Sequence, residues 1–453
     1  MFRKILIANR GDIAVTIIRA CREMGIASVA VCSEADRDAL HAQIADECVC
    51  IGPAASKDSY LNMQAILSAC LTTGAEAIHP GFGFLSENPV FARLCEKCGI
   101  KFIGPSAQIM DMMGNKANAR KTAEQAGIPI IPGSIGAIPD LGTAKRDAER
   151  IGYPVLIKAS QGGGGRGMRV AAGEADLAGA FQMAKTEAKA CFGNDEVYLE
   201  KLVLEPRHIE IQLLCDEFGH VIHLGDRDCS VQRRNQKIIE EATSPFVTDE
   251  LRIRMGGAAV CLARKIGYTG VGTIEFLVDK DRNFYFMEMN TRIQVEHPVS
   301  EAITGVNLIQ EQIRVAAGEI LRFAQRDIVF HGHSIECRIN AEDPENDFRP
   351  CPGTIQKLHL PGGPGVRIDS AAYQGYSIPP YYDSLLAKLI VHAPTREDAI
   401  ARMRRALTEF VIIGVKTNID FHLRILREPD FIRGHYDNTY LERKRDVLFP
   451  ERE

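Results

Sequence analysis

Alternating polar side chains between Glu288 and Glu296 form the densest group of reactive residues in the sequence. Within the run EMNTRIQVEH, polar residues recur at every second position: Glu288, Asn290, Arg292, Gln294 and Glu296. Alternate side chains of an extended segment share one face, so the pattern predicts that these groups point the same way. Carboxylate and amide oxygens suit a hard divalent cation, a guanidinium and an amide suit a small planar oxyanion, and a further carboxylate can accept a proton. We therefore expect a metal, an anion and a base side by side.

Two apolar segments lead into this run and bring a further carboxylate to it. Residues 272–278 (GTIEFLV) and 283–287 (NFYFM) are predicted to be buried strands joined by the turn-like cluster at 279–283. A hairpin of these strands brings Glu275 towards Glu288, and a lone glutamate in an apolar strand needs a partner or a metal. A polar edge strand would also explain the alternation. The apolar run that precedes it disfavours this alternative.

A glycine-rich run at residues 162–167 (GGGGRG) is the second chemical signal. Glycines let the backbone approach a ligand closely and point successive N–H groups at phosphate. The run is not a Walker A loop, because no Gly-Lys-Ser/Thr follows it. A flexible linker is the alternative, but the segments 153–158 and 168–170 resemble the two strands of a hairpin, which favours a flap over triphosphate. Lys116 and Lys158 are candidate phosphate contacts, with ordinary surface lysines as the alternative.

Two further strands are expected to face the same ligand. Residues 198–201 (YLEK) end a strand with Glu200, whose carboxylate could accept a hydrogen bond from the adenine amino group. Residues 207–212 (RHIEIQ) alternate in polarity, which places His208 and Glu210 on one face.

The first third of the chain alternates short apolar runs with helical stretches. The expected strands and helices cover residues 5–8, 13–24, 28–32, 60–71, 77–79 and 101–103. This alternation is typical of a doubly wound parallel sheet. The turn at 9–12 lacks the G-x-G-x-x-G pattern of dinucleotide-binding folds, which disfavours an oxidoreductase. The glycines at 79–88 fit either a binding crevice at a strand end or plain turns.

Composition indicates an ordinary globular protein. The chain has 453 residues, of which 45% are hydrophobic and 25% charged, enough for two or three domains. A net charge of -5 gives no reason to expect nucleic acid, and no apolar run is long enough to cross a membrane. The thirteen scattered cysteines fit reduced thiols in a cytosolic protein, and the single C-x-x-C at 95–98 has no partner for a zinc site.

Together these segments resemble the biotin carboxylase subunit of biotin-dependent carboxylases, which are ATP-grasp ligases. The matching stretches, spread over essentially the whole chain, are residues 8–11, 79–88, 158–170, 228–234, 288–298, 336–344, 379–384 and 414–418. Any one stretch is a moderate signal, whereas their order and spacing together are specific.

The resemblance implies a mixed α/β fold in three parts. Residues 1–113 would form an N-terminal, Rossmann-like domain with a parallel sheet. Residues 114–328 would form the ATP-grasp domain, with the glycine-rich flap in a lid at about 131–203. Residues 329–446 would form the biotin carboxylase C-terminal domain.

Roles for individual residues follow from the same resemblance. It implies ATP contacts from Lys116, Lys158, Gly163, Gly164, Gly165, Glu200, Lys201, Val203, His208, Gln232 and Leu277. The implied ligands of Mg²⁺ or Mn²⁺ are Glu275, Glu288 and Asn290, with Lys237 on the terminal phosphate. Bicarbonate would be held by Arg292, Gln294 and the backbone N–H of Val295, with Glu296 as the base. Biotin would contact Phe82 and Arg338, and Arg338 would stabilise the biotin enolate. A structural ion pair with Glu336 or Glu342 is the alternative role of Arg338.

The implied reaction is the first half-reaction of acetyl-CoA carboxylase in fatty acid synthesis, which leads to malonyl-CoA. Bicarbonate attacks the terminal phosphorus of ATP, the resulting carboxyphosphate breaks down to carbon dioxide and phosphate, and the biotin enolate attacks carbon dioxide. The sequence contains no Ala-Met-Lys-Met run of the kind that carries biotin. We therefore expect a separate biotin carboxyl carrier protein, separate carboxyltransferase subunits and a cytoplasmic homodimer.

Three other functions stay open at this point. The chain could be the biotin carboxylase subunit of a two-subunit pyruvate or other acyl-CoA carboxylase. It could also be a different bicarbonate-activating ATP-grasp ligase, such as a carbamoyl-phosphate-forming synthetase, or a scaffold that has lost turnover. The segments around Arg338 and at 379–384 favour biotin over ammonia as the acceptor.

Four positions depart from the pattern of the family. Asn235 stands where many members have His, and Phe82 where Tyr is common. Thr16 and Pro364 replace an Arg and a Phe that lie near the dimer interface of well-known bacterial members. The first two substitutions concern ligand contacts, and the last two concern the homodimer.

Overall fold

The computed structural model describes residues 1–134, 136–160 and 167–449. The predicted ATP contacts Gly163, Gly164 and Gly165 lie outside the described residues.

A parallel sheet forms the N-terminal part, as predicted. Its strand order is β3-β2-β1-β4-β5. The strands are β1 (Lys4–Ile7), β2 (Ala27–Cys32), β3 (Glu47–Cys50), β4 (Ala77–His79) and β5 (Lys101–Phe102). The helices are α1 (Gly11–Glu23), α2 (Leu40–Ile44), α3 (Met63–Thr73), α4 (Pro89–Lys97) and α5 (Ala107–Gly114). Asn62, Asn88 and Ser106 begin the last three helices by accepting a hydrogen bond from a backbone N–H of the first turn.

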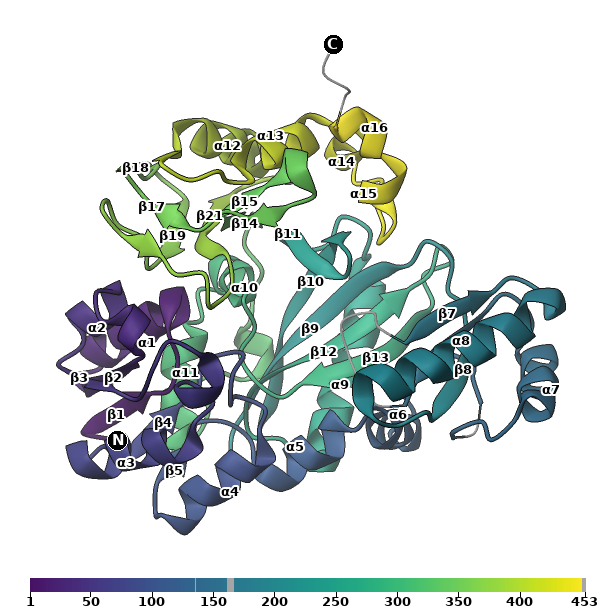
Figure 1. The fold of residues 1–453 in the computed structure, drawn as a ribbon, viewed down its shortest axis with the longest axis horizontal. Coiled ribbons are helices and arrows are strands. Elements are labelled where there is room, and N and C mark those ends of the chain that lie inside the picture. The colour runs from purple at the N-terminus through teal and green to yellow at the C-terminus, as the bar shows by residue number, and fades with distance from the viewer. Residues whose placement is uncertain (135, 161–166, 450–453) are drawn as a thin grey trace.

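An antiparallel sheet of eight strands occupies the centre of the molecule (Figure 1). In spatial order its strands are β13 (Phe284–Asn290), β12 (Gly270–Val278), β9 (Arg207–Cys215), β10 (Val221–Arg233), β11 (Gln236–Ala242), β14 (His333–Asn340), β21 (Leu385–Ala393) and β19 (Val366–Ser370). One continuous sheet therefore joins strands from the predicted ATP-grasp part and from the predicted C-terminal part. Helices α9 (Asp249–Ile266), α10 (His297–Thr304) and α11 (Leu308–Ala316) belong to this region.

Strand β9 separates the hydrophobic core from the polar face of this sheet. Ile209, Ile211 and Leu213 pack with residues of α9 in one apolar cluster. The residues between them, His208, Glu210 and Gln212, therefore point to the opposite face. The predicted sharing of one face by His208 and Glu210 is confirmed by a distance of 3.8 Å between His208 Nε2 and Glu210 Oε2.

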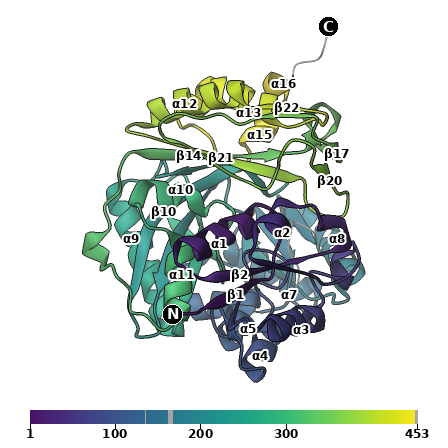
Figure 2. The same cartoon turned by 90° about the vertical axis from the view of Figure 1, so that its left-hand side faces the viewer.

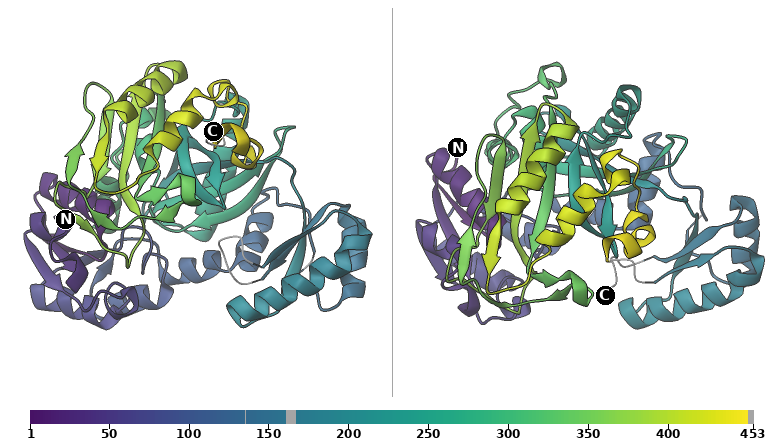
Figure 3. Two further views of the ribbon diagram at one scale, coloured as in Figure 1. Left: turned by 45° about the horizontal axis from the view of Figure 1, so that its top comes forward. Right: turned by 90° about the horizontal axis from the view of Figure 1, so that it is seen from above.

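A small α/β unit projects from the rest of the molecule, as both views in Figure 3 show. It consists of α7 (Leu141–Ile151), β6 (Val155–Ala159), β7 (Met168–Ala171), α8 (Glu174–Phe192) and β8 (Val197–Lys201). We call these five elements the lid. The predicted hairpin is confirmed, because β6 and β7 pair antiparallel with Lys158 opposite Met168. Helix α6 (Lys116–Gln125) connects the N-terminal part to the lid.

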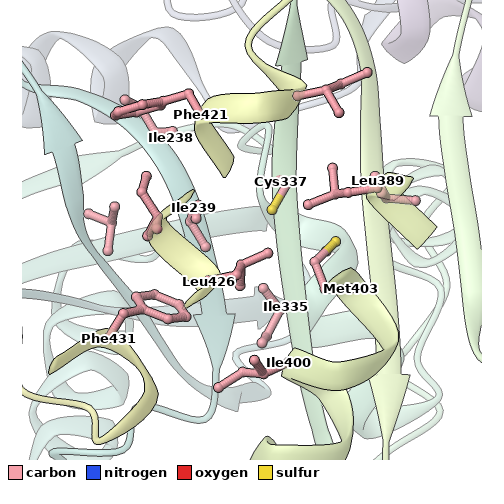
Figure 4. Close-up of a cluster of buried hydrophobic side chains, with 14 of the residues drawn as sticks. Ile238, Ile239, Ile335, Cys337, Leu389, Ile400, Met403, Phe421, Leu426 and Phe431 are labelled. Atoms are coloured by element: carbon pink, nitrogen blue, oxygen red, sulfur yellow. The ribbon is translucent and has the colours of Figure 1, made fainter. Parts of the chain in front are cut away.

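Two layers of helices cover the C-terminal end of the large sheet. Helices α12 (Arg396–Glu409) and α13 (Ile419–Arg427) lie over one face of β14 and β21, and α10 lies under the other (Figure 2). Ile335, Cys337 and Leu389 point into the upper layer, where they meet Met403 and Leu426 (Figure 4). The alternating neighbours Glu336 and Arg338 therefore point away from this core, to the face that carries polar groups.

Short elements complete this part of the chain. They are the strand pairs β15 (Glu342–Asp343) with β16 (Arg349–Pro350), β17 (Gly353–Thr354) with β20 (Ser377–Ile378), and β18 (Lys357–His359) with β22 (Val411–Ile413). The last helices are α14 (Pro429–Ile432), α15 (Tyr440–Arg443) and α16 (Arg445–Leu448). No helix in the described ranges is long and apolar enough to cross a lipid bilayer.

The predicted extended run from Glu288 to Glu296 is wrong beyond Asn290. Strand β13 ends at Asn290, and residues 291–296 form a loop that leads directly into α10. Period-two polarity therefore did not arise from a strand here. The loop nevertheless buries Gln294 and Glu296, which are only 3% and 2% exposed.

Candidate active site

A cavity of about 930 Å³ lies where the N-terminal part, the lid and the large sheet meet. Most of the predicted site residues line it: Phe82, Lys116, Lys158, Glu200, His208, Gln232, Lys237, Glu275, Glu288, Asn290, Arg292, Gln294, Val295, Glu296 and Arg338. Lys201, Val203 and Leu277 do not line it. Residues that sequence reasoning assigned to separate segments are thus brought to one cavity.

The predicted acidic hairpin is present. Glu275 of β12 lies directly opposite Glu288 of β13, and the register shifts just beyond this pair. Asn290 donates from Nδ2 to Glu275 Oε1 over 2.9 Å, and Lys116 Nζ lies 3.5 Å from Glu288 Oε2. His208 Nε2 is 3.0 Å from Glu275 Oε2. The two carboxylates and the amide oxygen of Asn290 form the type of oxygen donor set that Mg²⁺ prefers.

Lys237 is the ionic centre of the site. Its ammonium lies 2.7 Å from Glu210, 3.0 Å from Glu275 and 2.6 Å from Glu296. Burial alone would lower the pKa of Lys237, but these carboxylates raise it well above its ordinary value. Burial opposes the ionisation of Glu275, yet Lys237 and His208 hold its pKa well below the ordinary value. The site therefore keeps its charges fixed before any ligand binds.

Arg227, which sequence reasoning did not identify as a site residue, holds the acidic and amide groups around Lys237 in place. It is fully buried and donates to Glu210 (2.6 Å), Gln212 (2.5 Å), Ser300 (3.0 Å), Thr273 (3.2 Å) and Gln294 (2.7 Å). A single arginine in a strand is usually a surface residue, and no local pattern distinguishes this one. Its burial could be found only from the spatial neighbours that supply its acceptors.

The loop after β13 presents groups for a small anion. Arg292 donates from Nε to Glu87 Oε2 (2.8 Å) and from Nη2 to Asn290 Oδ1 (3.0 Å). Gln294 donates to Glu275 Oε1 (2.9 Å), while its own oxygen accepts from Arg227. Glu87 comes from the glycine-containing loop at 79–88, which is thereby tied to the site.

Glu296 connects Lys237, which contacts the acidic hairpin, to Arg338. It lies 2.6 Å from Lys237 and 2.9 Å from Arg338, and it begins α10 as the N-cap residue. Burial would raise the pKa of Glu296, but Lys237 and Arg338 lower it below the ordinary value. The expected alternative for Arg338, an ion pair with Glu336 or Glu342, is wrong. Its second partner is Glu240, at 2.5 Å from Nη2, which sequence reasoning did not identify.

The lid end of the cavity carries its own charge cluster. Glu200 accepts from Arg120 Nη1 (2.5 Å) and from Lys158. Lys201 instead donates to the carbonyl oxygens of Gly152 (2.9 Å) and Tyr153 (2.7 Å), which shows that its side chain fastens the lid. Further lining residues that were not predicted as contacts are Arg120, Ile131, Met168, Tyr198 and Phe286.

The structure shows the surroundings of two residues that depart from the family pattern, Asn235 and Phe82. Arg234 and Asn235 form the two-residue turn between β10 and β11, with φ values of 50° and 64°. Asparagine tolerates this left-handed conformation better than most residues, which explains its presence at the turn. Phe82 lines the cavity, and its ring lies 5.9 Å from the ammonium of Lys388.

Comparison with known proteins identifies the family. The biotin carboxylase N-terminal domain matches residues 1–110, the ATP-binding domain of the carbamoyl-phosphate synthase L chain matches residues 115–324, and the biotin carboxylase C-terminal domain matches residues 336–443. The middle match is shared with carbamoyl-phosphate synthases. The two outer matches are therefore the ones that separate the families.

Individual relatives cover nearly the whole chain. Biotin carboxylase 1 of Bacillus subtilis is 57% identical over 443 residues and 98% of each chain. One of the pyruvate carboxylase subunits of Methanothermobacter thermautotrophicus is 55% identical over 445 residues, which cover 98% of this chain and 90% of that one. The biotin carboxylase domain dimer of Hydrogenobacter thermophilus 2-oxoglutarate carboxylase, in complex with MgADP, ADP and bicarbonate, has a TM-score of 0.94 at 52% identity and covers 99% of each chain. With its N-terminal, ATP-binding and C-terminal parts all matched, the chain belongs to the biotin carboxylase family of ATP-dependent ligases.

Proposed function

We propose that the chain carboxylates biotin held on a separate carrier protein, using ATP and bicarbonate, by way of carboxyphosphate. The observation that carries this proposal is the position of Glu296 between Lys237 and Arg338. The carboxylate of Glu296 thereby links Lys237, proposed to contact the terminal phosphate, to Arg338, proposed to contact biotin. A site for phosphate activation alone would not need Arg338.

ATP is proposed to lie between the lid and the large sheet. Lys116 and Lys158 supply positive charge for its phosphates, and His208 and Gln232 lie deeper in the cavity. Gln232 Nε2 lies 2.9 Å from His208 Nδ1, which orients the imidazole. Glu200 is proposed to accept a hydrogen bond from the adenine amino group. To do so it would give up a contact with Arg120 or Lys158.

A divalent cation fits the acidic hairpin. Glu275, Glu288 and the amide oxygen of Asn290 would hold Mg²⁺ or Mn²⁺, because this donor set is composed of hard oxygens. When bound, the cation neutralises phosphate charge. The chain's own residues supply the remaining stabilisation, since Lys237 can release Glu275 and turn towards the terminal phosphate.

Bicarbonate is proposed to lie against Arg292, Gln294 and the backbone N–H of Val295. Its O–H proton passes to Glu296, and the resulting carbonate oxygen attacks the terminal phosphorus while ADP leaves. The lowered pKa of Glu296 keeps it ionised and ready to accept this proton. Lys237 and Arg338, which contact its two oxygens, position the carboxylate.

Carboxylation of biotin completes the proposed half-reaction. Carboxyphosphate loses carbon dioxide, and the phosphate released takes the proton from the ureido nitrogen of biotin. The enolate forms a bond to carbon dioxide through nitrogen. Arg338 faces the developing negative charge, for which a permanently charged fork donor is well suited. Phe82 forms part of the wall proposed for biotin.

Acetyl-CoA carboxylase is the proposed complex, with a biotin carboxyl carrier protein and carboxyltransferase subunits as partners in the cytoplasm. Relatives named simply as biotin carboxylases support the half-reaction and name no acyl acceptor. Subunits of pyruvate and 2-oxoglutarate carboxylases are similar to this chain at 55% and 52% identity, and they support the alternative acceptors.

We also propose domain boundaries at 113/114 and 328/329. A homodimer is proposed as well, although Thr16 and Pro364 differ from the residues near the dimer interface of well-known bacterial members.

The test is ADP release with MgATP and bicarbonate, with and without free biotin, together with trapping of labelled carboxybiotin. Biotin-stimulated ADP release with label in biotin supports the proposal. ATP cleavage that ignores biotin but responds to ammonia would indicate another ATP-grasp ligase. Absence of any ATP cleavage would favour a scaffold. Addition of purified carriers and carboxyltransferases, with acetyl-CoA, pyruvate or 2-oxoglutarate, then identifies the acceptor.

A further inference from the structure

Two buried carboxyl groups face each other behind Arg338. Glu240 of β11 and Glu336 of β14 are direct partners in the antiparallel ladder, and both are 0% exposed. Directly opposed side chains of such a ladder have Cβ atoms roughly 4.5–5.5 Å apart. Glu240 Oε2 and both carboxyl oxygens of Glu336 have no hydrogen-bond donor among the described residues. The usual means of burying a carboxylate are therefore lacking for Glu336.

The charges around this pair favour one ionised and one neutral member. Arg338 binds the other oxygen of Glu240, at 2.6 Å from Nε and 2.5 Å from Nη2. On β21, Lys388 is directed elsewhere, because it lies 3.2 Å from Asp12 and 3.1 Å from the carbonyl of Val295.

Lys388 and Arg338 act on Glu336 from a distance, but within the described part of the chain no cation forms an ion pair with it. The remaining titratable groups near the pair are Lys237 on β11, Cys229 on β10, Glu296 at the start of α10, His297 and Glu301 on α10, and Asp369 on β19. Lys237 is occupied by its carboxylates, and Glu301 binds Arg367 (2.6 Å). His297 is kept neutral, because burial lowers its pKa well below the ordinary value.

Burial, together with the repulsion between two negative charges, requires that either Glu240 or Glu336 carries a proton. Two facing carboxylates that are both fully buried cannot easily both ionise at neutral pH. Burial raises the pKa of Glu336 well above its ordinary value, and it also raises the pKa of Glu240, where the charge of Arg338 opposes it. Arg338 contacts Glu240 directly and acts on Glu336 only from a greater distance, so the proton belongs on Glu336.

We propose that Glu336 is a positioning residue that stays protonated at neutral pH and donates a hydrogen bond to Glu240, which remains an ionised carboxylate that holds Arg338. The other partner of Arg338, Glu296, becomes neutral when it accepts the proton of bicarbonate. Glu240 then holds the guanidinium in place while biotin reacts. This role of the pair in biotin binding rests on the proposed function, whereas the shared proton does not.

Infrared spectroscopy of the protein labelled with ¹³C-carboxyl glutamate tests the proton directly. At pH 7 we expect a band of a protonated glutamic acid that Glu336→Gln removes. Glu311→Gln is the matched control, because Glu311 is equally buried but pairs with Arg322 and Arg314. The band should persist in this control. A wild-type protein without the band, or a band that survives Glu336→Gln, would overturn the proposal.

Kinetics then test the positioning role. Glu336→Gln keeps a neutral donor, so its KM for biotin should stay within about twofold of wild type. Glu336→Leu removes the donor, and Glu240→Gln removes the charge, so each should raise the KM for biotin by about 10- to 100-fold with little change in biotin-independent ADP release. An unchanged KM in both variants would refute the role. A wild-type enzyme that ignores biotin would instead refute the proposed function, and the infrared result would still stand.

Discussion

Replacing Arg227 by methionine tests whether the buried guanidinium organises the site. Methionine has a similar length but no donors, so the change removes all five hydrogen bonds of Arg227 without creating a large cavity. Glu210 then keeps Lys237 at 2.7 Å and, at a longer 3.8 Å, His208 as its cationic partners. Gln294 loses the donor that fixes its amide oxygen.

Two magnitudes follow from these contacts. Breaking a buried ion pair by removing one partner costs about 3–5 kcal/mol. With an unfolding entropy of about 2.1 cal/mol/K per residue, cooperative unfolding of a chain of this size loses about 3–5 °C in Tm for that cost. A lost charged hydrogen bond weakens the placement of Gln294 by about 1.5–3 kcal/mol, so the KM for bicarbonate should rise by about 10- to 100-fold.

Circular dichroism melting and ADP release at saturating MgATP measure the two effects. Arg326→Met is the matched control, because the side chain of Arg326 is 89% exposed and the change should leave both values near wild type. Arg227→Lys should be intermediate, since it keeps the charge but not the fork. An Arg227→Met variant with unchanged Tm and unchanged KM for bicarbonate would refute the reasoning.

Further predictions concern the proposed base, the biotin contact and acid stability. Glu296→Gln should slow bicarbonate-dependent ADP release by about 10²- to 10⁴-fold and leave the Kd of MgATP within about threefold, and a large loss of nucleotide binding in a titration would contradict the assigned role. Arg338→Gln should slow biotin carboxylation more than biotin-independent ATP cleavage, whereas equal losses would place Arg338 elsewhere. Burial opposes the ionisation of Asp369, but Lys388 and Arg367 lower its pKa from 3.8 to about 2. Its stabilising contribution of about 2 kcal/mol is therefore complete above pH 3.8 and is lost as the pH falls towards 2, so melting scans of Asp369→Asn should show a weaker pH dependence in that window than wild type.

Local pattern was sufficient for the hairpins and the parallel sheet. Glu275 and Glu288 could be placed together because two apolar strands and a short turn fix their register. The five-stranded N-terminal sheet was also predictable, except for β3. Three of the four residues of β3 are exposed, so it has no apolar run by which to recognise it.

Contacts between distant segments could not be derived from pattern alone. Gln294 and Glu296 do line the cavity with Glu288, but a loop and a helix start bring them there instead of the predicted strand. Arg227 was missed because its partners are spread over positions 15 to 73 residues away on two strands, a loop and a helix, and Glu240 because Arg338 is 98 positions away. Such pairing depends on the order of strands in the sheet, which no single segment encodes.

The continuous eight-stranded sheet also limits how the protein can be divided or recombined. Strands β11 and β14 pair from Ile239 opposite Cys337 to Ala242 opposite Ser334, across the join between the two predicted domains. A fragment that ends before β14 would expose the whole backbone edge of β11, and such an edge tends to pair with other chains and aggregate. Exchange of C-terminal parts between relatives must therefore preserve the register of this ladder as well as the catalytic residues. A cut at the predicted boundary at 328/329 would therefore divide the sheet.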